Sequence, residues 1–219
     1  MTSYPGAVGD NGAVSRLLDL AIACNETPGA ELDDELARFC RTVRNSPEAS
    51  WAMPVATITA VLDLLSEYVE EKEPGQLSAG FTERVVRAAA GIPVPEYLRL
   101  LSGLVRIRDR EPVPDFAALP MADWEAELRF DRIGQFWWYV DSGEYELFDE
   151  GVREGVSSEH PNGCRIELSA LAAQLQTALI LFPTTASMAE GLGKVAPSAS
   201  PLVLQAVLDA IHRHFAEEH

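Results

Sequence analysis

The residues best suited to chemistry are four histidines and one cysteine in the C-terminal part of the chain. His160 precedes Cys164 by four positions, and the segment HRHFAEEH contributes His212, His214 and His219. Imidazole and thiolate are the donors that zinc prefers, and a Cys–His pair is also the arrangement of a nucleophile beside its base. These residue types therefore raise two possibilities, a metal site and a nucleophilic enzyme.

The spacing of these residues favours neither possibility. His212 and His219 are seven apart and share a helix face, whereas His214 points elsewhere. A site on that face would need the helix to stay intact to its last residue, where helices fray. For His160 and Cys164, nothing in the sequence indicates burial or an orienting third group. We predict that no metal ion or cofactor is bound, and that His160 is a turn residue before a proline.

No established catalytic motif is present. The chain has no GxSxG nucleophile elbow and no HExxH zinc motif. The segment EGLGKVA at 190–196 differs from a phosphate-binding loop, because Met188 stands where the first glycine belongs and no Ser or Thr follows Lys194. Carboxylates are too numerous to single out a catalytic pair. We therefore predict no catalytic residue, and the sequence leans away from an enzyme.

A second group of residues points to binding. The segment QFWWYVDSGEYELFDE, residues 135–150, combines large aromatic rings with five carboxylates. If Trp137 and Tyr139 lie on an uncovered face, they form an aromatic patch inside an acidic rim, which suits a basic protein partner. The alternative is that helices cover this face and the same rings belong to the core. The predicted binding residues are Trp137, Tyr139, Asp141, Glu144, Glu146, Asp149 and Glu150.

The charge balance excludes several classes of partner. The chain has 17 Lys and Arg against 34 Asp and Glu, a formal net charge of −17. Such a surface repels phosphate backbones and anionic membranes, which disfavours binding to nucleic acid or to a membrane. It attracts basic proteins, although acidity also simply keeps a protein soluble. A basic protein is therefore the predicted partner.

The charge is also unevenly distributed. Residues 1–110 hold 11 basic and 16 acidic residues, a net of −5, and residues 111–219 hold 6 and 18, a net of −12. Within the first part, 84–110 is locally basic. This segment can dock on the acidic segment 141–167 of the same chain or of a second copy, so a homo-oligomer is one expectation. The other is that the acidic segment stays free for a foreign basic surface.

Cysteine usage and the first residues indicate a reducing compartment. Cys24, Cys40 and Cys164 are odd in number and form no CxxC pair, which argues against a disulfide framework. The start, MTSYPGAVGDNGAV, has no basic region followed by an apolar run, so no signal peptide is predicted. The apolar runs are too short to cross a bilayer. We expect a cytoplasmic protein, and the scarcity of lysine suggests a bacterial source.

Hydrophobic periodicity predicts the elements that position these residues. Residues 1–12 are predicted to be a disordered tail and 13–109 a helical part, with a proline-rich junction at 110–120. In 121–219, period-two alternation beginning at Ile133 predicts a small antiparallel β-meander, which three helical segments follow. The predicted fold is α+β and mostly helical, with the meander covered by helices and the parts forming one or two domains. The strands are expected near 133–140, 145–147, 152–156 and 164–168.

These observations together favour a function without catalysis. The order of helix, meander and covering helix is similar to that of bacterial immunity proteins that neutralise toxins, an architectural likeness without a shared motif. We expect an acidic protein-binding module, such as an inhibitor, an immunity-type protein or an adaptor, that engages a basic partner through its acidic, aromatic sheet face. The alternative is a small-molecule enzyme or ligand-binding domain, with a pocket between the helical part and the sheet lined by Trp137 and Tyr139.

Overall fold

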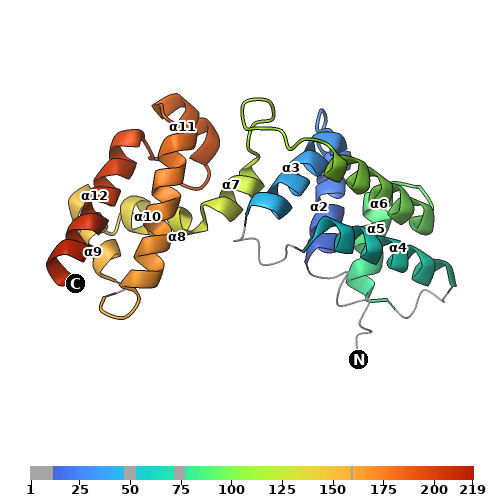
Figure 1. Cartoon of the computed structure of the whole chain (residues 1–219), viewed down its shortest axis with the longest axis horizontal. Coiled ribbons are helices and arrows are strands. Elements are labelled where there is room, and N and C mark those ends of the chain that lie inside the picture. Colours follow the sequence, from blue (N-terminus) through green and yellow to red (C-terminus); the bar gives the residue numbers. More distant parts are fainter. Residues whose placement is uncertain (1–11, 47–52, 72–76, 159) are drawn as a thin grey trace. The chain divides into compact units, whose positions relative to one another are not determined.

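The structure is a computed structural model that describes residues 12–46, 53–71, 77–158 and 160–219, and every regular element in these ranges is an α-helix (Figure 1). Except for Gly12, the predicted tail lies outside the described residues. The chain divides into an N-terminal unit, Met1–Pro120, and a C-terminal unit, Met121–His219. Among the helices so described, none combines the length and the apolar character needed to cross a bilayer.

The N-terminal unit is helical where the sequence predicts helices. Acidic residues stand in the first turn of α3 and Arg44 in its last turn, an order that suits the helix dipole. Ser78 caps α5 by accepting a hydrogen bond from the backbone nitrogen of Phe81 at 3.0 Å. Helices α4 and α6 pack along each other. The helices of this unit are α2 (Ala13–Glu26), α3 (Leu32–Asn45), α4 (Val55–Glu71), α5 (Ala79–Ala89) and α6 (Val94–Arg110).

The proline-rich segment 111–120 is held against α3 by a buried arginine. The Arg41 Nη1 atom donates hydrogen bonds to the carbonyl oxygens of Pro114, at 3.2 Å, and Leu119, at 2.8 Å. The same guanidinium lies 4.3 Å from the centroid of the Phe116 ring. A buried guanidinium needs such acceptors to offset its desolvation. The segment that the sequence marks as a junction is therefore an ordered part of the N-terminal unit.

Replacing Arg41 with lysine is expected to lower the free energy of unfolding by about 2 kcal/mol, because a single ammonium group does not reproduce the planar fork of donors. The measurement is denaturant unfolding followed by circular dichroism. Arg110→Lys is the matched control, since Arg110 is exposed, and it should change stability by less than about 0.5 kcal/mol. Equal effects of the two substitutions would contradict an anchoring role for Arg41.

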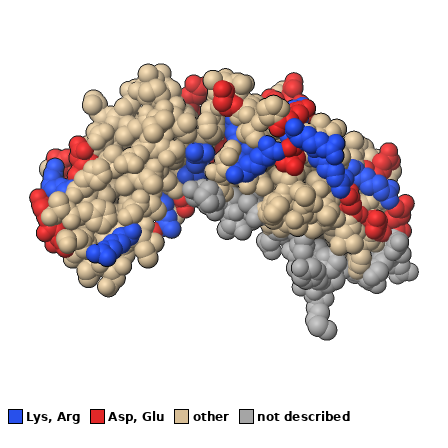
Figure 2. Space-filling model, viewed as in Figure 1, with Lys and Arg blue, Asp and Glu red and all other residues tan. Residues whose placement is uncertain are grey.

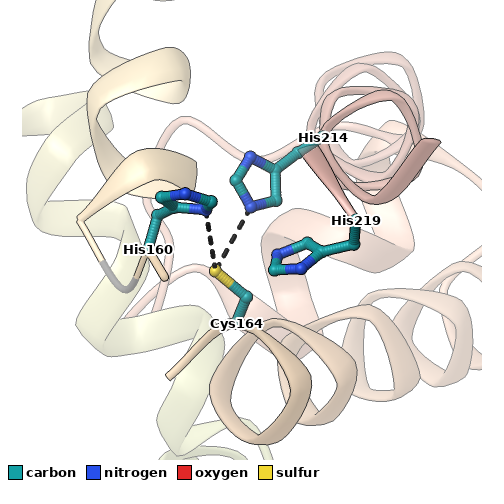
Figure 3. Close-up of side chains that lie close together, drawn as sticks. All are labelled: His160, Cys164, His214 and His219. Carbon is teal, nitrogen blue, oxygen red and sulfur yellow. Dashed lines mark hydrogen bonds between the residues drawn. The ribbon is translucent and has the colours of Figure 1, made fainter. Parts of the chain in front are cut away.

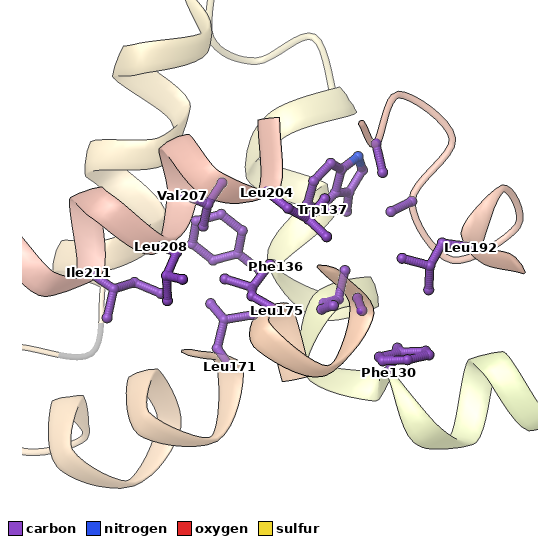
Figure 4. Packing of buried hydrophobic residues seen from close by; sticks show 14 of the residues in the cluster. Phe130, Phe136, Trp137, Leu171, Leu175, Leu192, Leu204, Val207, Leu208 and Ile211 are labelled. Atoms are coloured by element: carbon purple, nitrogen blue, oxygen red, sulfur yellow. The ribbon is translucent and has the colours of Figure 1, made fainter. Parts of the chain in front are cut away.

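The C-terminal unit packs its helices around one hydrophobic core. Phe136 from α8, Leu171 and Leu175 from α10, and Val207 and Ile211 from α12 meet in its interior (Figure 4). Burial of these side chains from three helices supplies the main stabilisation of the unit. The helices are α7 (Asp123–Arg129), α8 (Asp131–Asp141), α9 (Phe148–Ser157), α10 (Cys164–Leu181), α11 (Thr185–Leu192) and α12 (Pro201–Glu218).

The predicted β-meander, and with it the α+β fold class, is wrong. The expected strand at 133–140 lies in α8, the one at 152–156 lies in α9, and 164–168 forms the first turns of α10. The segment 141–143, predicted as a turn between strands, instead follows a helix: Gly143, with a φ of 74°, lies just after α8 and before α9. The described part of the chain contains no strand.

The error has a clear physical origin in the run FWWYV, residues 136–140. A continuous run of large apolar residues satisfies a strand period and a helix period equally well. In the structure Ile133, Phe136 and Trp137 are buried and Val140 is partly buried, which is the i, i+3, i+4, i+7 pattern of a helix. Trp138, expected to share a face with Phe136, is 54% exposed.

Candidate metal centre

Four side chains that can ligate a metal converge in the C-terminal unit. The nearest ligand atoms of His160, Cys164, His214 and His219 all lie within 4.8 Å of one another. In Figure 3 the three imidazole rings surround the Cys164 sulfur. These four residues are called the Cys–His cluster below.

Three segments of the unit bring the Cys–His cluster together. His160 lies in the turn between α9 and α10, where its backbone nitrogen donates to the Ser157 carbonyl at 3.0 Å. Cys164 is the first residue of α10. His214 lies in the last turns of α12 and His219 directly follows that helix. Packing of α12 against α9 and α10 therefore sets the distance between the two pairs of ligands.

The geometry is close to that of a tetrahedral site. The Cys164 Sγ atom lies 3.2 Å from His214 Nε2 and 3.9 Å from His160 Nδ1. The ring centroids of the three histidines lie 5.3, 5.3 and 5.4 Å apart, nearly an equilateral triangle. In a tetrahedral zinc site, with metal–ligand distances of about 2.0–2.3 Å, the ligand atoms lie about 3.3–3.8 Å apart. Small side-chain movements are enough to close the cluster around an ion.

The electrostatics of the cluster favour the neutral form of His214. Burial lowers the pKa of His214, and the neighbouring His160 and His219 lower it further, while Glu218 acts in the opposite direction. A neutral imidazole is the form that binds a metal, because a protonated nitrogen has no lone pair to give.

The lowered pKa of His214 predicts how the metal-free protein responds to pH. The unfolded chain binds a proton at the ordinary histidine value near 6.5, whereas the folded protein does so only at lower pH. This contribution to stability is fully present above the unfolded pKa and is lost as the pH falls toward the folded one. We expect the free energy of unfolding of metal-free protein to drop between pH 7.5 and pH 5.5. His214→Gln should reduce that drop, while His212→Gln, at an exposed position on the same helix, should leave it unchanged.

Burial argues against a catalytic role for the thiol. Cys164 is 0% exposed, so a substrate has no access to its sulfur. A cysteine nucleophile needs partial exposure as well as a base. The proximity of Cys164 and His214 therefore fits a ligand pair better than a catalytic dyad.

The four residues of the Cys–His cluster are visible in the sequence, but their spacing does not show that they lie together in the fold. The prediction of no metal site rested on His212 and His219, yet His212 is exposed and takes no part in the cluster. His214 reaches the site because His219, lying just beyond α12, turns back beside it. The other two ligands, His160 and Cys164, stand fifty residues earlier in the chain, and only tertiary packing brings them close.

The predicted binding residues differ in their exposure to solvent. Trp137 is 2% exposed, and its indole nitrogen donates to Ser198 Oγ at 3.0 Å, which donates to Asp141 Oδ1 at 2.6 Å. Burial therefore removes Trp137 from any exposed binding surface. Of the remaining predicted residues, Tyr139 and Glu150 are partly buried and Asp141, Glu144, Glu146 and Asp149 are exposed.

Five of the six arginines of 84–110 form ion pairs within their own unit. Figure 2 shows basic and acidic side chains intermingled on the visible side of the N-terminal unit. Exposed pairs contribute little stability, but they reduce the positive potential available to another surface. The charge argument for docking on 141–167 loses its main support, and the oligomeric state stays a prediction. The pairs are Arg84 with Asp19, Arg87 with Glu26, Arg99 with Glu70, Arg106 with Asp63, and Arg108 with Asp33 and Glu111.

Comparison with known proteins adds no relative. No protein-family model, curated protein or solved structure matches the chain. The functional interpretation therefore rests on the chemistry of the described residues.

Proposed function

We propose that this chain is a metal-binding protein whose C-terminal unit holds a zinc ion in a Cys–His₃ structural centre. The observation that carries the proposal is the convergence of four ligand atoms within 4.8 Å from three separate segments. A thiolate and three imidazoles make a donor set of intermediate softness, which suits zinc.

The arrangement supports a structural rather than a catalytic centre. Four protein ligands complete the tetrahedral shell of zinc, whereas catalytic sites keep one position for water or substrate. The bound ion would connect the end of α12 to the turn before α10 and to Cys164. Since zinc binds the folded arrangement and not the separated segments, its binding energy would stabilise the C-terminal unit.

The test is metal content together with a pair of histidine variants. Protein purified without chelator or affinity histidines should contain close to one zinc per chain by elemental analysis. His214→Ala should weaken zinc binding by at least about tenfold in competition with a chromogenic chelator. His212→Ala removes the same side chain from the same helix and should retain wild-type affinity. Equal affinities of the two variants would contradict the proposal.

A second candidate function, binding to a basic protein, is supported by the surface after α8. Leu147 is 67% exposed, and around it Glu144, Glu146 and Asp149 are exposed and have no ion-pair partner within the described ranges. Burial raises the pKa of Tyr145, and the nearby carboxylates of Glu144, Glu154 and Glu150 raise it further. Such a surface suits a cationic partner with an apolar contact, as an inhibitor, immunity-type or adaptor protein in the cytoplasm would need.

This second candidate is tested with a cationic amphipathic peptide of lysine and leucine. Binding should weaken steeply with salt, and Glu146→Lys with Asp149→Lys should weaken it by about tenfold or more. Glu190→Lys with Asp209→Lys, at exposed positions on α11 and α12, changes the net charge by the same amount and is the control for net charge alone. A similar loss in all variants would show a non-specific effect of charge and contradict a defined binding surface.

A further inference from the structure

The C-terminal unit contains an open pocket of about 300 Å³ that includes no residue of the Cys–His cluster. Helix α8 forms one wall with Trp138 and Tyr139, and helix α10 forms another with Leu168 and Leu171. Its volume is at the lower end of the range for small-molecule sites, about 300–1,000 Å³. A lining of rings and aliphatic side chains with a few polar groups is also typical of such sites.

The aromatic wall of the pocket has a defined geometry. The rings of Trp138 and Tyr139 meet edge to face, with centroids 5.2 Å apart and an interplanar angle of 83°. Phe136 continues the wall, and its ring centroid lies 6.0 Å from that of Tyr139. Trp138 is 54% exposed, whereas the equally large side chain of Trp137 is buried. An exposed ring beside a hollow offers a ready stacking surface for another planar ring.

The polar groups of the pocket indicate an uncharged ligand. Arg132 and Glu167 line it together and form an ion pair, so their charges cancel. A charged ligand of either sign would have to compete with that pair. Gln135 is exposed and its side-chain amide has no hydrogen-bond partner among the described residues, which leaves one donor group and one acceptor free at the rim.

We propose that this pocket binds a small, uncharged, planar heteroaromatic molecule. Its ring would stack on Trp138 and rest against Leu168 and Leu171. A ring nitrogen or carbonyl at its edge would be read by the Gln135 amide. The proposal is independent of the metal centre, because none of the four ligating residues lines the pocket.

The test compares three indole probes that differ in charge: indole, indole-3-acetate and tryptamine. Binding to the full chain is measured by saturation-transfer NMR and by shifts of ¹⁵N-labelled amides. Indole is expected to bind with a dissociation constant of about 1 mM and to shift amides of α8, α9 and α10. The anion and the cation are expected to bind at least about fivefold more weakly. Equal or tighter binding of either ion would overturn the uncharged class, and no transfer to indole would overturn the site.

A variant pair locates the binding. Trp138→Ala removes an exposed ring and should weaken indole binding by about fivefold or more. Ile180→Ala removes an apolar side chain that is 78% exposed on α10 and does not line the pocket, so it should leave the affinity unchanged. An equal loss in both variants, or no loss in the first, would contradict stacking on Trp138.

Discussion

Replacing Cys164 with serine is expected to lower the affinity for zinc by about a thousandfold or more, because a neutral hydroxyl takes the place of the one anionic ligand. The consequence for stability follows from linkage. Free zinc at a thousand times its dissociation constant raises the free energy of unfolding by about 4 kcal/mol, and that gain should be almost absent in the variant. Denaturant unfolding with and without zinc measures it. Three of the four tryptophans, Trp124, Trp137 and Trp138, belong to the C-terminal unit, so tryptophan fluorescence reports mainly on that unit.

Cys40→Ser is the matched control for this substitution. Cys40 is also a buried free cysteine, but it lies on α3, and burial raises the pKa of its thiol to about 11. It is therefore a neutral thiol at physiological pH and is no part of the Cys–His cluster. Both variants should lose some stability by placing a hydroxyl in an apolar site. Only the control should keep the full gain from zinc. A variant at Cys164 that retained this gain would show that zinc binds elsewhere.

The spectrum of cobalt offers a second readout of the same variant. Cobalt(II) replaces zinc in tetrahedral sites and shows a thiolate charge-transfer band when a cysteine is bound. The wild-type protein should show this band together with the visible bands of four-coordinate cobalt. Cys164→Ser should lose the charge-transfer band, whereas Cys40→Ser should keep it. Loss in both variants would indicate a general change of fold rather than loss of a ligand.

Local signals in the sequence are strong enough to predict most helices but not the fold class. Helices α2 to α6 carry clear apolar stripes, and α3 and α6 also place acids in the first turn and arginines in the last. Ser200 with Pro201 correctly marks the start of α12. The aromatic run of α8 was wrongly predicted to be a strand. Every position from Phe136 to Val140 is apolar or aromatic, so no polar face distinguishes a strand from a helix.

The candidate metal centre could not be predicted from the spacing of its residues along the chain. About half the length of the C-terminal unit separates His160 and Cys164 from His214, and no motif links the two pairs. Their distance is decided by how α12 packs on α9 and α10, which is a property of the whole core. One local signal for close packing of α9 is the repeat Gly151-x-x-x-Gly155, which places two glycines on one face of a helix.

Gly151→Ala is expected to lower the free energy of unfolding by about 3 kcal/mol, against the trend of helix propensity. Alanine is favoured over glycine inside a helix by about 1 kcal/mol, so an isolated α9 would gain from the change. In the folded protein, however, the new Cβ atom would lie 2.1 Å from the backbone oxygen of Tyr139 on α8. A backbone oxygen does not rotate away as a side chain does. The two helices would have to separate, and the core contacts between them would be lost.

Two further glycines make this prediction a graded series. At Gly155 a Cβ atom would meet the Phe136 ring at 2.6 Å, and because a ring can shift, Gly155→Ala should cost less, about 1–2 kcal/mol. At Gly103 on α6 nothing lies within 4 Å, so Gly103→Ala should stabilise the N-terminal unit by about 0.5–1 kcal/mol. Thermal unfolding of the three variants should therefore give opposite signs for Gly103 and Gly151, with Gly155 between them. If Gly151→Ala were as stabilising as Gly103→Ala, α8 and α9 would not pack at this distance, and the pocket wall formed by Tyr139 would not stand where the structure has it.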